Sequence, residues 1–373
     1  MKILILSLTV GGGHNSAAKA LQEYFISAGA ECETLDTFGY ISPAFADSLN
    51  KSYVFVAGRM GKAFGLGYHT AEKRKPVQIA EKTPAQITGT PLAKELLRYI
   101  DTYQPDVILF THCFAGIVLH LLKNEERISV PTVGILTDFV FHPYWEDCTA
   151  NDYVVIPSAD LCQQAHRKGF SDSQLLPFGI PIAPKFAESM PKDEARKALG
   201  LHPDGATVLL MGGSMGHGKM SDSVAALDSL PLGENYQIIV VCGSNKKMYE
   251  EISAMQTVHR VLVLGFANNV DVLMDAADVI VTKPGGLTTS EALAKRLPMV
   301  IVNPIPGQES RNTEFLLNSG TAVATNDMCG AEELVYRLLS SPARRTAMHT
   351  CIDSLRRPNS TAAICEFVMN LKK

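Results

Sequence analysis

Short apolar runs alternate with segments of helical spacing along most of the 373-residue chain. Apolar runs without polar alternation are typical of strands that are buried on both faces of a sheet. They occupy positions 3–8, 107–110, 132–136, 153–156, 208–211, 238–242, 261–264, 279–281, 299–302 and 321–324. Helical spacing occupies positions 16–27, 92–103, 115–122, 159–166 and 360–371. The alternation predicts an α/β fold with parallel sheets.

The alternation is interrupted at positions 178–184, where the sequence FGIPIAP is rich in proline and glycine. Segments of this composition are common between domains, so we expect a linker here. A chain of 373 residues is long for one hydrophobic core and sufficient for two. The sequence therefore predicts two α/β domains joined by a short linker.

A second interruption, between residues 40 and 90, is basic and contains aromatic and apolar side chains. Between Lys51 and Lys82 seven lysines and arginines stand against two glutamates, whereas the net charge of the whole chain is −4. An anionic membrane surface attracts such a segment, at about 1 kcal/mol per cation. The alternative is a solvated helix pair that packs on the domain. The residues that would meet the membrane or a lipid are Lys62, Phe64, Lys73, Arg74 and Lys75.

Composition and charge exclude several classes of protein. The net charge of −4 argues against general affinity for nucleic acid. Eight cysteines are scattered without a CxxC motif or a Cys/His pairing, so neither a zinc site nor a disulfide framework is indicated. The apolar run at 3–8 is too short for a signal peptide, and no run approaches the roughly 18 apolar residues that span a bilayer. We expect a cytoplasmic protein.

The most informative stretch comprises residues 278–312. Its first apolar run ends at the turn 284–286, PGG, whose glycines let the backbone approach a ligand closely. The hydroxyls at 288–290 are expected to cap a helix that contains Glu291. A second apolar run follows and ends at the polar sequence PIPGQE. One βαβ unit therefore brings a helix N-terminus, which favours an anion, to the ligand-binding edge of a sheet.

Two other glycine clusters also follow strands. The sequence GGSMGHG at 212–218 alone is a generic signal for a turn or a phosphate, but together with the turn at 284–286 it predicts a pyrophosphate cradle. Three glycines at 11–13 precede His14 at the start of a helix. A plain tight turn and a capping or surface histidine are the alternatives to a ligand role there.

A polar loop follows the strand expected at 132–136. It contains Asp138 and His142, four positions apart, and the only tryptophan of the chain, Trp145. Open α/β sheets bind ligands at this end of their strands. The aspartate and the histidine could form a hydrogen-bonded structural pair, or they could act in catalysis or in acceptor binding.

Five motifs in a fixed order resemble one family. PGGLTTSEAL and PIPGQESRN are similar to the donor site of glycosyltransferase family 28, above all of its diacylglycerol glycosyltransferases. This group comprises the bacterial processive diacylglycerol glucosyltransferases and the plant monogalactosyldiacylglycerol synthases. GGGH at 11–14, the loop at 137–145 and GIP at 179–181 fit the same family, so the resemblance spans nearly the whole chain.

The resemblance implies a GT-B fold, in which two Rossmann-like domains face a central cleft. Residues 1–180 would form an N-terminal domain that faces the membrane and binds the lipid acceptor. Residues 181–357 would form the nucleotide-sugar donor domain. Residues 358–373 would form a C-terminal helix that returns to the N-terminal domain.

The implied reaction is an inverting transfer of glucose or galactose from a UDP-sugar to diacylglycerol, by a protein peripherally associated with the cytoplasmic membrane. The expected partners are UDP-glucose or UDP-galactose, diacylglycerol and an anionic membrane surface, with no nucleic acid. The UDP-sugar would be a substrate, so no cofactor is expected. No metal is expected either, because the chain has no Asp-x-Asp motif for a metal clamp.

The resemblance also implies roles for single residues. His14 would be the general base, with Asp138 and His142 as the other catalytic candidates. Glu291 would bind the ribose hydroxyls. The further donor-site residues would be Gly13, Ser214, Phe266, Ala267, Gly285, Gly286, Leu287, Thr288, Gln308, Glu309 and Asn312. Trp145 would join the basic segment in facing the acceptor or the membrane.

Two functions from other classes remain open at this point. A UDP-sugar 2-epimerase has the same architecture and would act on the donor without a lipid. A non-catalytic nucleotide-sugar sensor would bind the donor and act through a protein partner. Epimer formation without an acceptor would distinguish the first, and binding without turnover the second.

Overall fold

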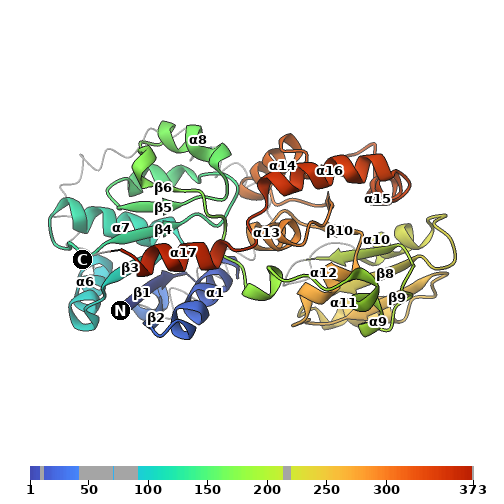
Figure 1. The fold of residues 1–373 in the computed structure, drawn as a ribbon, viewed down its shortest axis with the longest axis horizontal. Coiled ribbons are helices and arrows are strands. Elements are labelled where there is room, and N and C mark those ends of the chain that lie inside the picture. The colour runs from blue at the N-terminus through green and yellow to red at the C-terminus, as the bar shows by residue number, and fades with distance from the viewer. Residues whose placement is uncertain (9–11, 42–69, 71–90, 213–219, 372–373) are drawn as a thin grey trace. The chain divides into compact units, whose positions relative to one another are not determined.

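The computed structural model describes residues 1–8, 12–41, 70, 91–212 and 220–371 (Figure 1). The chain divides into two compact units. The first unit comprises Met1–Pro184, Pro306–Gln308 and Asn359–Lys373, and the second comprises Lys185–Ile305 and Glu309–Pro358. In the described part of the chain, each unit contains one six-stranded sheet whose neighbouring strands are all parallel.

The sheet of the first unit has the strand order β2-β1-β3-β4-β5-β6. Its strands are β1 (Lys2–Ser7), β2 (Glu31–Asp36), β3 (Val107–Phe110), β4 (Thr132–Ile135), β5 (Tyr153–Val155) and β6 (Leu175–Leu176). Its α-helices are α1 (Gly13–Ser27), α2 (Thr37–Ile41), α6 (Pro91–Tyr103), α7 (Cys113–Asn124), α8 (Cys162–Arg167) and, from the end of the chain, α17 (Ser360–Met369). Short 3₁₀ helices are η2 (Pro143–Cys148), η3 (Ala159–Leu161) and η4 (Asp172–Gln174).

The sheet of the second unit has the strand order β12-β11-β10-β7-β8-β9. Its strands are β7 (Thr207–Met211), β8 (Gln237–Val241), β9 (Arg260–Leu264), β10 (Val279–Thr282), β11 (Met299–Ile301) and β12 (Ala322–Ala324). The helices are η5 (Pro184–Phe186), α9 (Lys192–Ala198), α10 (Met220–Asp228), α11 (Lys246–Ser253), α12 (Val270–Ala276), α13 (Gly286–Ala294), α14 (Gln308–Asn318), α15 (Ala331–Leu339) and α16 (Pro342–Leu355).

Both sheets reverse their strand order beside their first strand. In the first unit the chain places β2 on one side of β1 and β3 on the other. In the second unit β8 lies on one side of β7 and β10 on the other. The loops that leave two such strands at their carboxyl ends go to opposite faces of the sheet, which opens a crevice where open α/β sheets bind ligands. The switch points therefore lie after β1 and β3, and after β7 and β10.

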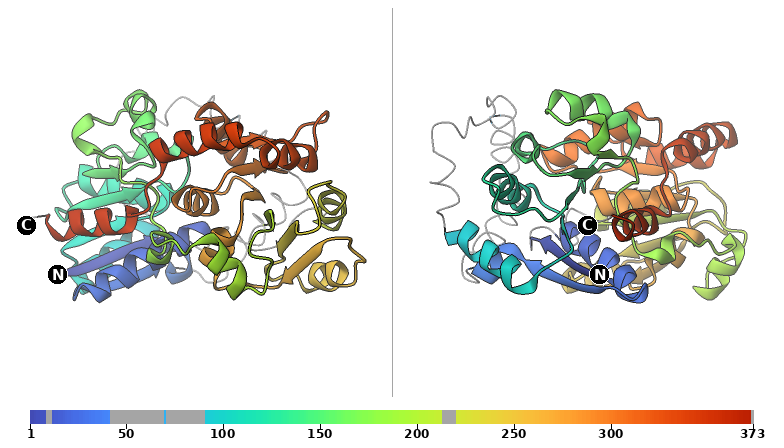
Figure 2. Two further views of the ribbon diagram at one scale, coloured as in Figure 1. Left: turned by 45° about the vertical axis from the view of Figure 1, so that its right-hand side comes forward. Right: turned by 60° about the vertical axis from the view of Figure 1, so that its left-hand side comes forward.

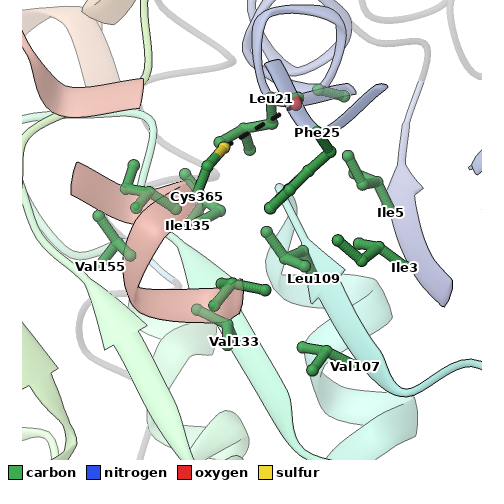
Figure 3. Packing of buried hydrophobic residues seen from close by; sticks show 13 residues of the cluster. Ile3, Ile5, Leu21, Phe25, Val107, Leu109, Val133, Ile135, Val155 and Cys365 are labelled. Carbon is green, nitrogen blue, oxygen red and sulfur yellow. Dashed lines mark hydrogen bonds between the residues drawn. The ribbon is translucent and has the colours of Figure 1, made fainter. Parts of the chain in front are cut away.

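The C-terminal helix α17 packs on the first unit and completes its core. Ile364, Cys365 and Val368 are fully buried in a cluster with residues of α1, β1, β3, β4 and β5. Figure 3 shows Cys365 beside Leu21 of α1, whose carbonyl oxygen lies 3.9 Å from the cysteine sulfur. Both views in Figure 2 again show this helix, in red, close to the blue N-terminal elements. The expected return of the C-terminal helix is confirmed.

The predicted elements are found with small differences at their ends. The helix expected at 16–27 begins at Gly13, and the segment 159–166 is split into η3 and α8. The apolar pattern does not predict β2, because this edge strand has the polar sequence ECETLD and no fully buried residue. In the described residues, no helix is long and apolar enough to cross a membrane.

We expect Ile364→Ala to lower the free energy of unfolding by about 2–5 kcal/mol, because it removes a fully buried side chain and leaves a cavity. Glu366→Ala is the matched control, since this exposed side chain lies on the same helix; a change within about 0.5 kcal/mol is expected there. Denaturant unfolding measures both values. Equal losses in the two variants would contradict the packing of α17 described above.

Candidate functional site

In the first unit, two histidines follow the strands on either side of the switch point. His14 is the second residue of α1, the helix that follows β1. His112 follows β3 and is the N-cap of α7. Their rings meet edge to face, with 4.7 Å between the centroids. The reversal of strand order thus places two imidazoles side by side at a ligand-binding edge.

The hydrogen bonds of His14 define which ring nitrogen is free. Its Nδ1 lies 2.7 Å from the carbonyl oxygen of Thr111 and 3.2 Å from the hydroxyl oxygen of Thr137. A carbonyl oxygen only accepts, so Nδ1 has the proton and donates it, and Nε2 has the lone pair. No described residue donates a hydrogen bond to Nε2. A ring fixed in this tautomer can accept a proton at Nε2.

The surroundings keep His14 neutral near pH 7. Burial lowers the pKa of His14, while the nearby carboxylate of Asp138 and the Thr111 carbonyl act in the opposite direction. The N-terminus of α1 also disfavours the imidazolium, because its helix dipole is positive there. Gly12, the N-cap, has φ 79°, a left-handed conformation that favours glycine. The glycine preceding the helix is therefore needed for the turn that positions His14.

His112 is the functional candidate that the sequence analysis missed. The backbone N–H of Phe114 donates to its Nδ1 over 3.2 Å, so the proton of the neutral ring is on Nε2. Burial, together with His14 and His142, holds the pKa of His112 well below its usual value. The available signal was its place directly after the apolar run at 107–110, the same kind of position that singled out His14.

Asp138 and His142 both lie in the loop after β4, as expected. They differ in what they contact: His142 caps a short helix, whereas Asp138 acts on His14. His142 is the N-cap of η2, and its Nδ1 accepts a hydrogen bond from the backbone N–H of Tyr144 over 3.3 Å. The ring of His142 stacks on Tyr144, with 5.0 Å between centroids. Asp138 acts on His14 through its charge. The loop thus brings both residues to the neighbourhood of the two histidines at the switch point.

In the second unit, α13 begins at the glycine turn that follows β10. The backbone N–H groups of Gly286, Leu287 and Thr288 have no acceptor within the helix, because a helix begins with unpaired donors. The space where a side chain at Gly285 would lie is open. Helix N-termini with free N–H groups bind phosphate and carboxylate. The turn is therefore suited to a phosphate, as the sequence predicts.

Glu291, in the second turn of α13, is partly buried and lies near Lys185 and Asp271. Burial raises the pKa of Glu291 to about 8; the charge of Lys185 opposes this rise and that of Asp271 adds to it. Lys185 forms an ion pair with Asp271 over 2.9 Å and also donates to the carbonyl oxygen of Asn268. At pH 7 the carboxyl of Glu291 is therefore mostly protonated and can both donate and accept a hydrogen bond.

The loop after β9 lies next to this group. Phe266 is 71% exposed, unusual for a large apolar side chain, and Ala267 is partly exposed. Asn268 is tied to Lys185 through its carbonyl oxygen. Lys185 thus links the loop that contains Phe266 to the helix that follows it, α12, through Asp271. Neither Lys185 nor Asp271 was indicated by the sequence, since single charges beyond the glycine motifs give no pattern.

Two family models together match most of the chain. Residues 14–182 match monogalactosyldiacylglycerol (MGDG) synthase, and residues 207–352 match the glycosyltransferase family 28 C-terminal domain. The processive diacylglycerol beta-glucosyltransferase of Bacillus subtilis (strain 168) is 30% identical over 372 residues, which cover 99% of this chain and 94% of that protein. The chain belongs to glycosyltransferase family 28. It is therefore a glycosyltransferase.

Another relative and two solved structures are also similar to this chain. A probable chloroplastic monogalactosyldiacylglycerol synthase of Glycine max is 31% identical over 332 residues, which cover 86% of this chain and 61% of that protein. The crystal structure of Acinetobacter baumannii MurG is similar with a TM-score of 0.63 at 15% identity, over 99% of both chains. Anabaena Alr3699/HepE in complex with UDP-glucose has a TM-score of 0.54 at 16% identity, over 100% of both chains. These structures confirm the α/β GT-B fold.

The hydroxyls at 288–290 do not cap α13, contrary to expectation. This helix of the family 28 C-terminal domain begins at Gly286 with Gly285 as N-cap, and no side chain bonds to its end. Thr289 is fully buried, and its hydroxyl has no partner among the described residues. The Ser290 hydroxyl donates to the carbonyl oxygen of Gly286 over 2.8 Å. The N-cap residue Gly285 therefore provides no side-chain hydrogen bond to the N-terminal N–H groups of this helix.

Other expected site residues have structural partners. Asn312 of α14 is fully buried and donates from Nδ2 to the carbonyl oxygen of Pro284 over 3.0 Å, so it holds the glycine turn. Gln308 and Glu309 begin α14, and a carboxylate oxygen of Glu309 accepts from the Ile305 N–H over 2.6 Å. These contacts position the turn and the start of the helix.

Trp145 has a different environment from the one expected. It is 3% exposed and packs on Phe110 and Phe141, with ring centroids 5.8 and 6.0 Å apart. A buried ring cannot lie on a membrane, so Trp145 belongs to the core of the first unit. A cluster of three or more histidine, cysteine or acidic residues that could hold a metal ion is absent from the described residues. The remaining expected residues lie outside the described residues: Gly11, Lys62, Phe64, Lys73, Arg74, Lys75 and Ser214.

Glu291→Gln should stabilise the protein at pH 9 more than at pH 5. The folded state keeps the proton of Glu291 up to about pH 8, whereas the ordinary pKa is 4.5. The folded state thus binds more protons between these values, and its stability falls as the pH rises through them. A neutral glutamine avoids this loss, so its melting temperature at pH 9 should exceed that of the wild type by about 2–4 °C, the shift that 1 kcal/mol produces in a domain of 150–250 residues.

Two controls accompany this melting experiment. Glu250→Gln changes an exposed glutamate on α11 and should have the same small effect at both pH values. Lys185→Met removes the charge that lowers the pKa of Glu291, so the loss of stability with rising pH should continue to a higher pH than in the wild type. A pH-independent effect of Glu291→Gln would show that this carboxyl ionises normally.

Proposed function

We propose that this family 28 enzyme transfers glucose or galactose from a UDP-sugar to diacylglycerol, with inversion at the anomeric carbon. The main observation in support is His14, a neutral histidine whose Nδ1 is held by Thr111 and whose Nε2 has the lone pair. The names of relatives at about 30% identity, a diacylglycerol glucosyltransferase and a monogalactosyldiacylglycerol synthase, support the acceptor and the two sugars. A histidine held in this form can accept the proton of a hydroxyl, so His14 supports the transfer of a group to a hydroxyl.

The first unit supplies the acceptor side of the reaction. The oxygen of the acceptor hydroxyl attacks the anomeric carbon, and its proton passes to Nε2 of His14. The contact of Nδ1 with the Thr111 carbonyl holds the ring and stabilises the imidazolium that forms. Asp138 favours the same charged form, because its carboxylate raises the pKa of His14. In this mechanism Asp138 assists the base, and His142 shapes the loop next to it.

The second unit supplies the donor side. The free N–H groups at the start of α13 receive the pyrophosphate, whose charge grows as the bond to the sugar breaks. Glu291 binds the two ribose hydroxyls, one as donor and one as acceptor, because its carboxyl is protonated near pH 7. Phe266 and Ala267 offer the uracil a loop that Lys185 holds through Asn268. Family resemblance supports these roles, and the glycine turn held by Asn312 gives them a fixed frame.

A lipid acceptor requires contact with a membrane surface. The sequence supports this through the basic segment between Lys51 and Lys82, in a chain whose net charge is −4. Attraction between this segment and anionic lipids would be screened by salt, because the Debye length falls to about 3 Å at 1 M. The enzyme would then work as a peripheral protein whose donor is water-soluble and whose acceptor stays in the bilayer.

Incubation with labelled UDP-glucose or UDP-galactose and anionic vesicles that contain diacylglycerol should yield a glycosylated lipid, identified by mass. Vesicles without diacylglycerol are the control. One of the two donors should be preferred, because a hexose-binding site that hydrogen-bonds one hydroxyl disfavours its epimer. Formation of an epimer of the donor in the absence of lipid, or binding of UDP without any product, would contradict the proposal.

His14→Ala should lower kcat by about 10²–10⁴-fold, as expected for the loss of a general base. Affinity for UDP, measured by calorimetry, should change little because most of the expected donor-binding residues, Glu291 among them, lie in the second unit. Because the pKa of His14 is lowered, activity of the wild type should fall only below pH 6.5.

Asp138→Asn is the comparison for this base. It removes the charge that raises the pKa of His14, so the acid limb of kcat/KM should move to lower pH while turnover persists. An inactive Asp138→Asn together with a His14→Ala of near-normal turnover would identify Asp138 as the base instead.

A further inference from the structure

The two histidines at the switch point of the first unit have their protons on opposite ring nitrogens. Nδ1 of His14 donates to the Thr111 carbonyl, 2.7 Å away, which leaves a lone pair on Nε2. Nδ1 of His112 accepts from the backbone N–H of Phe114, 3.2 Å away, which leaves the proton on Nε2. The edge-to-face contact of 4.7 Å thus joins one proton acceptor and one proton donor.

The proton on Nε2 of His112 has no acceptor among the residues that the structure describes. Protonation of the whole ring is disfavoured, since burial and the neighbouring His14 and His142 lower its pKa. A neutral N–H donor that lies beside the base and has no acceptor in the described part of the chain is suited to a neutral oxygen of the substrate.

The proposed acceptor has such an oxygen next to its reactive group. The hydroxyl of diacylglycerol gives its proton to the base and a lone pair to the sugar, so a further donor on that oxygen would weaken the nucleophile. The other oxygens belong to two esters, and each carbonyl accepts hydrogen bonds but cannot donate them. One ester is attached to the carbon adjacent to the reactive CH₂OH group. A donor beside the base therefore matches an ester carbonyl.

The apolar neighbours of His112 fit the same ligand. Phe114 is 37% exposed and its ring lies 4.8 Å from that of His112. Tyr144 continues this surface, with its ring 5.8 Å from Phe114. An acyl chain begins at the carbonyl carbon, so apolar surface next to a carbonyl donor is what an ester-linked chain requires.

We propose that His112 is an acceptor-binding residue, which donates from Nε2 to an ester carbonyl oxygen of diacylglycerol while Nε2 of His14 accepts the proton of the hydroxyl. The inference rests on the proposed function and makes it more specific. The paired histidines bind two neighbouring oxygens of one lipid, and the enzyme selects ester-linked over ether-linked glycerolipids. Selection arises because a dialkylglycerol, which lacks the carbonyls, leaves the His112 donor unpaired.

Two variants of His112 separate its structural and binding roles. Asparagine at this position can still cap α7, because its side-chain oxygen accepts from the Phe114 N–H as Nδ1 does. Its amide is too short to replace Nε2. Glutamine reaches the position of Nε2 with an N–H group but does not preserve the cap. His112→Asn therefore keeps the cap of α7 and loses the donor. His112→Gln keeps the donor and loses the cap.

The experiment compares kcat/KM for diacylglycerol and for the ether analogue dialkylglycerol, presented in the same anionic vesicles. The wild type should prefer the ester by about tenfold, the scale of one hydrogen bond between neutral groups. His112→Asn should reduce this ratio to near one by losing ester activity, and His112→Gln should retain most of the preference. UDP affinity should be unchanged in both variants.

His120→Asn is the matched control, because His120 lies on the same helix and its Nδ1 accepts from the Ala150 N–H over 2.8 Å. This variant should keep the wild-type ratio. An unchanged ratio in His112→Asn, with normal melting temperature, would overturn this inference alone. Absence of transfer to either lipid by the wild type would overturn the proposed function, and this inference with it.

Discussion

The reversal of strand order beside the first strand of each sheet is the constraint on which the candidate residues of each unit depend. Parallel strands need crossover helices, and helices that leave neighbouring strands on opposite faces separate their loops at the carboxyl ends. In the first unit this separates the loops after β1 and β3, which contain His14 and His112. In the second it opens the start of α13 after β10. The same topology thus presents imidazoles in one unit and backbone donors in the other.

Removal of water then determines which form each titratable group takes. Burial disfavours the charged form of any group, so it lowers the pKa of His14 and His112 and raises that of Glu291. All three groups are consequently neutral near pH 7. A neutral imidazole accepts a proton, a second neutral imidazole donates a hydrogen bond, and a neutral carboxyl does both. Burial alone therefore gives these three residues different chemical roles.

The segment that enters the second unit, which includes Lys185 and Glu188, is attached to this unit by ion pairs and hydrogen bonds. Lys295 pairs with Asp275 over 2.7 Å, with side chains only 1% and 7% exposed, and also donates to the carbonyl oxygen of Glu188. A second pair, between Lys185 and Asp271, ties the first residue of this unit to α12. Breaking the buried Lys295–Asp275 pair would leave an uncompensated charge, so this contact holds the segment strongly. The Lys185–Asp271 pair is partly exposed and contributes less. The position of Lys185 near Glu291 follows from this attachment.

The sequence by itself determined the fold class and the glycine turns. Apolar runs such as 107–110 and 299–302 are long enough to identify buried parallel strands, and PGGLTTSEAL with PIPGQESRN identifies the family. The edge strand β2 escaped this reasoning, because one of its sides has no partner strand and its sequence is polar. A run of apolar residues identifies a strand only if the strand is buried, and an edge strand such as β2 is only partly buried.

Only the tertiary structure decided the environment of each side chain in the site. Trp145 was expected to face the acceptor or the membrane and is in the core, where it packs on Phe110 and Phe141. His112 follows an apolar run of the sequence, but only the strand order placed it against His14. The pKa of Glu291 depends on Lys185, which precedes it by more than a hundred residues. Sequence patterns describe neighbours along the chain, whereas desolvation, charge and tautomer depend on neighbours in space.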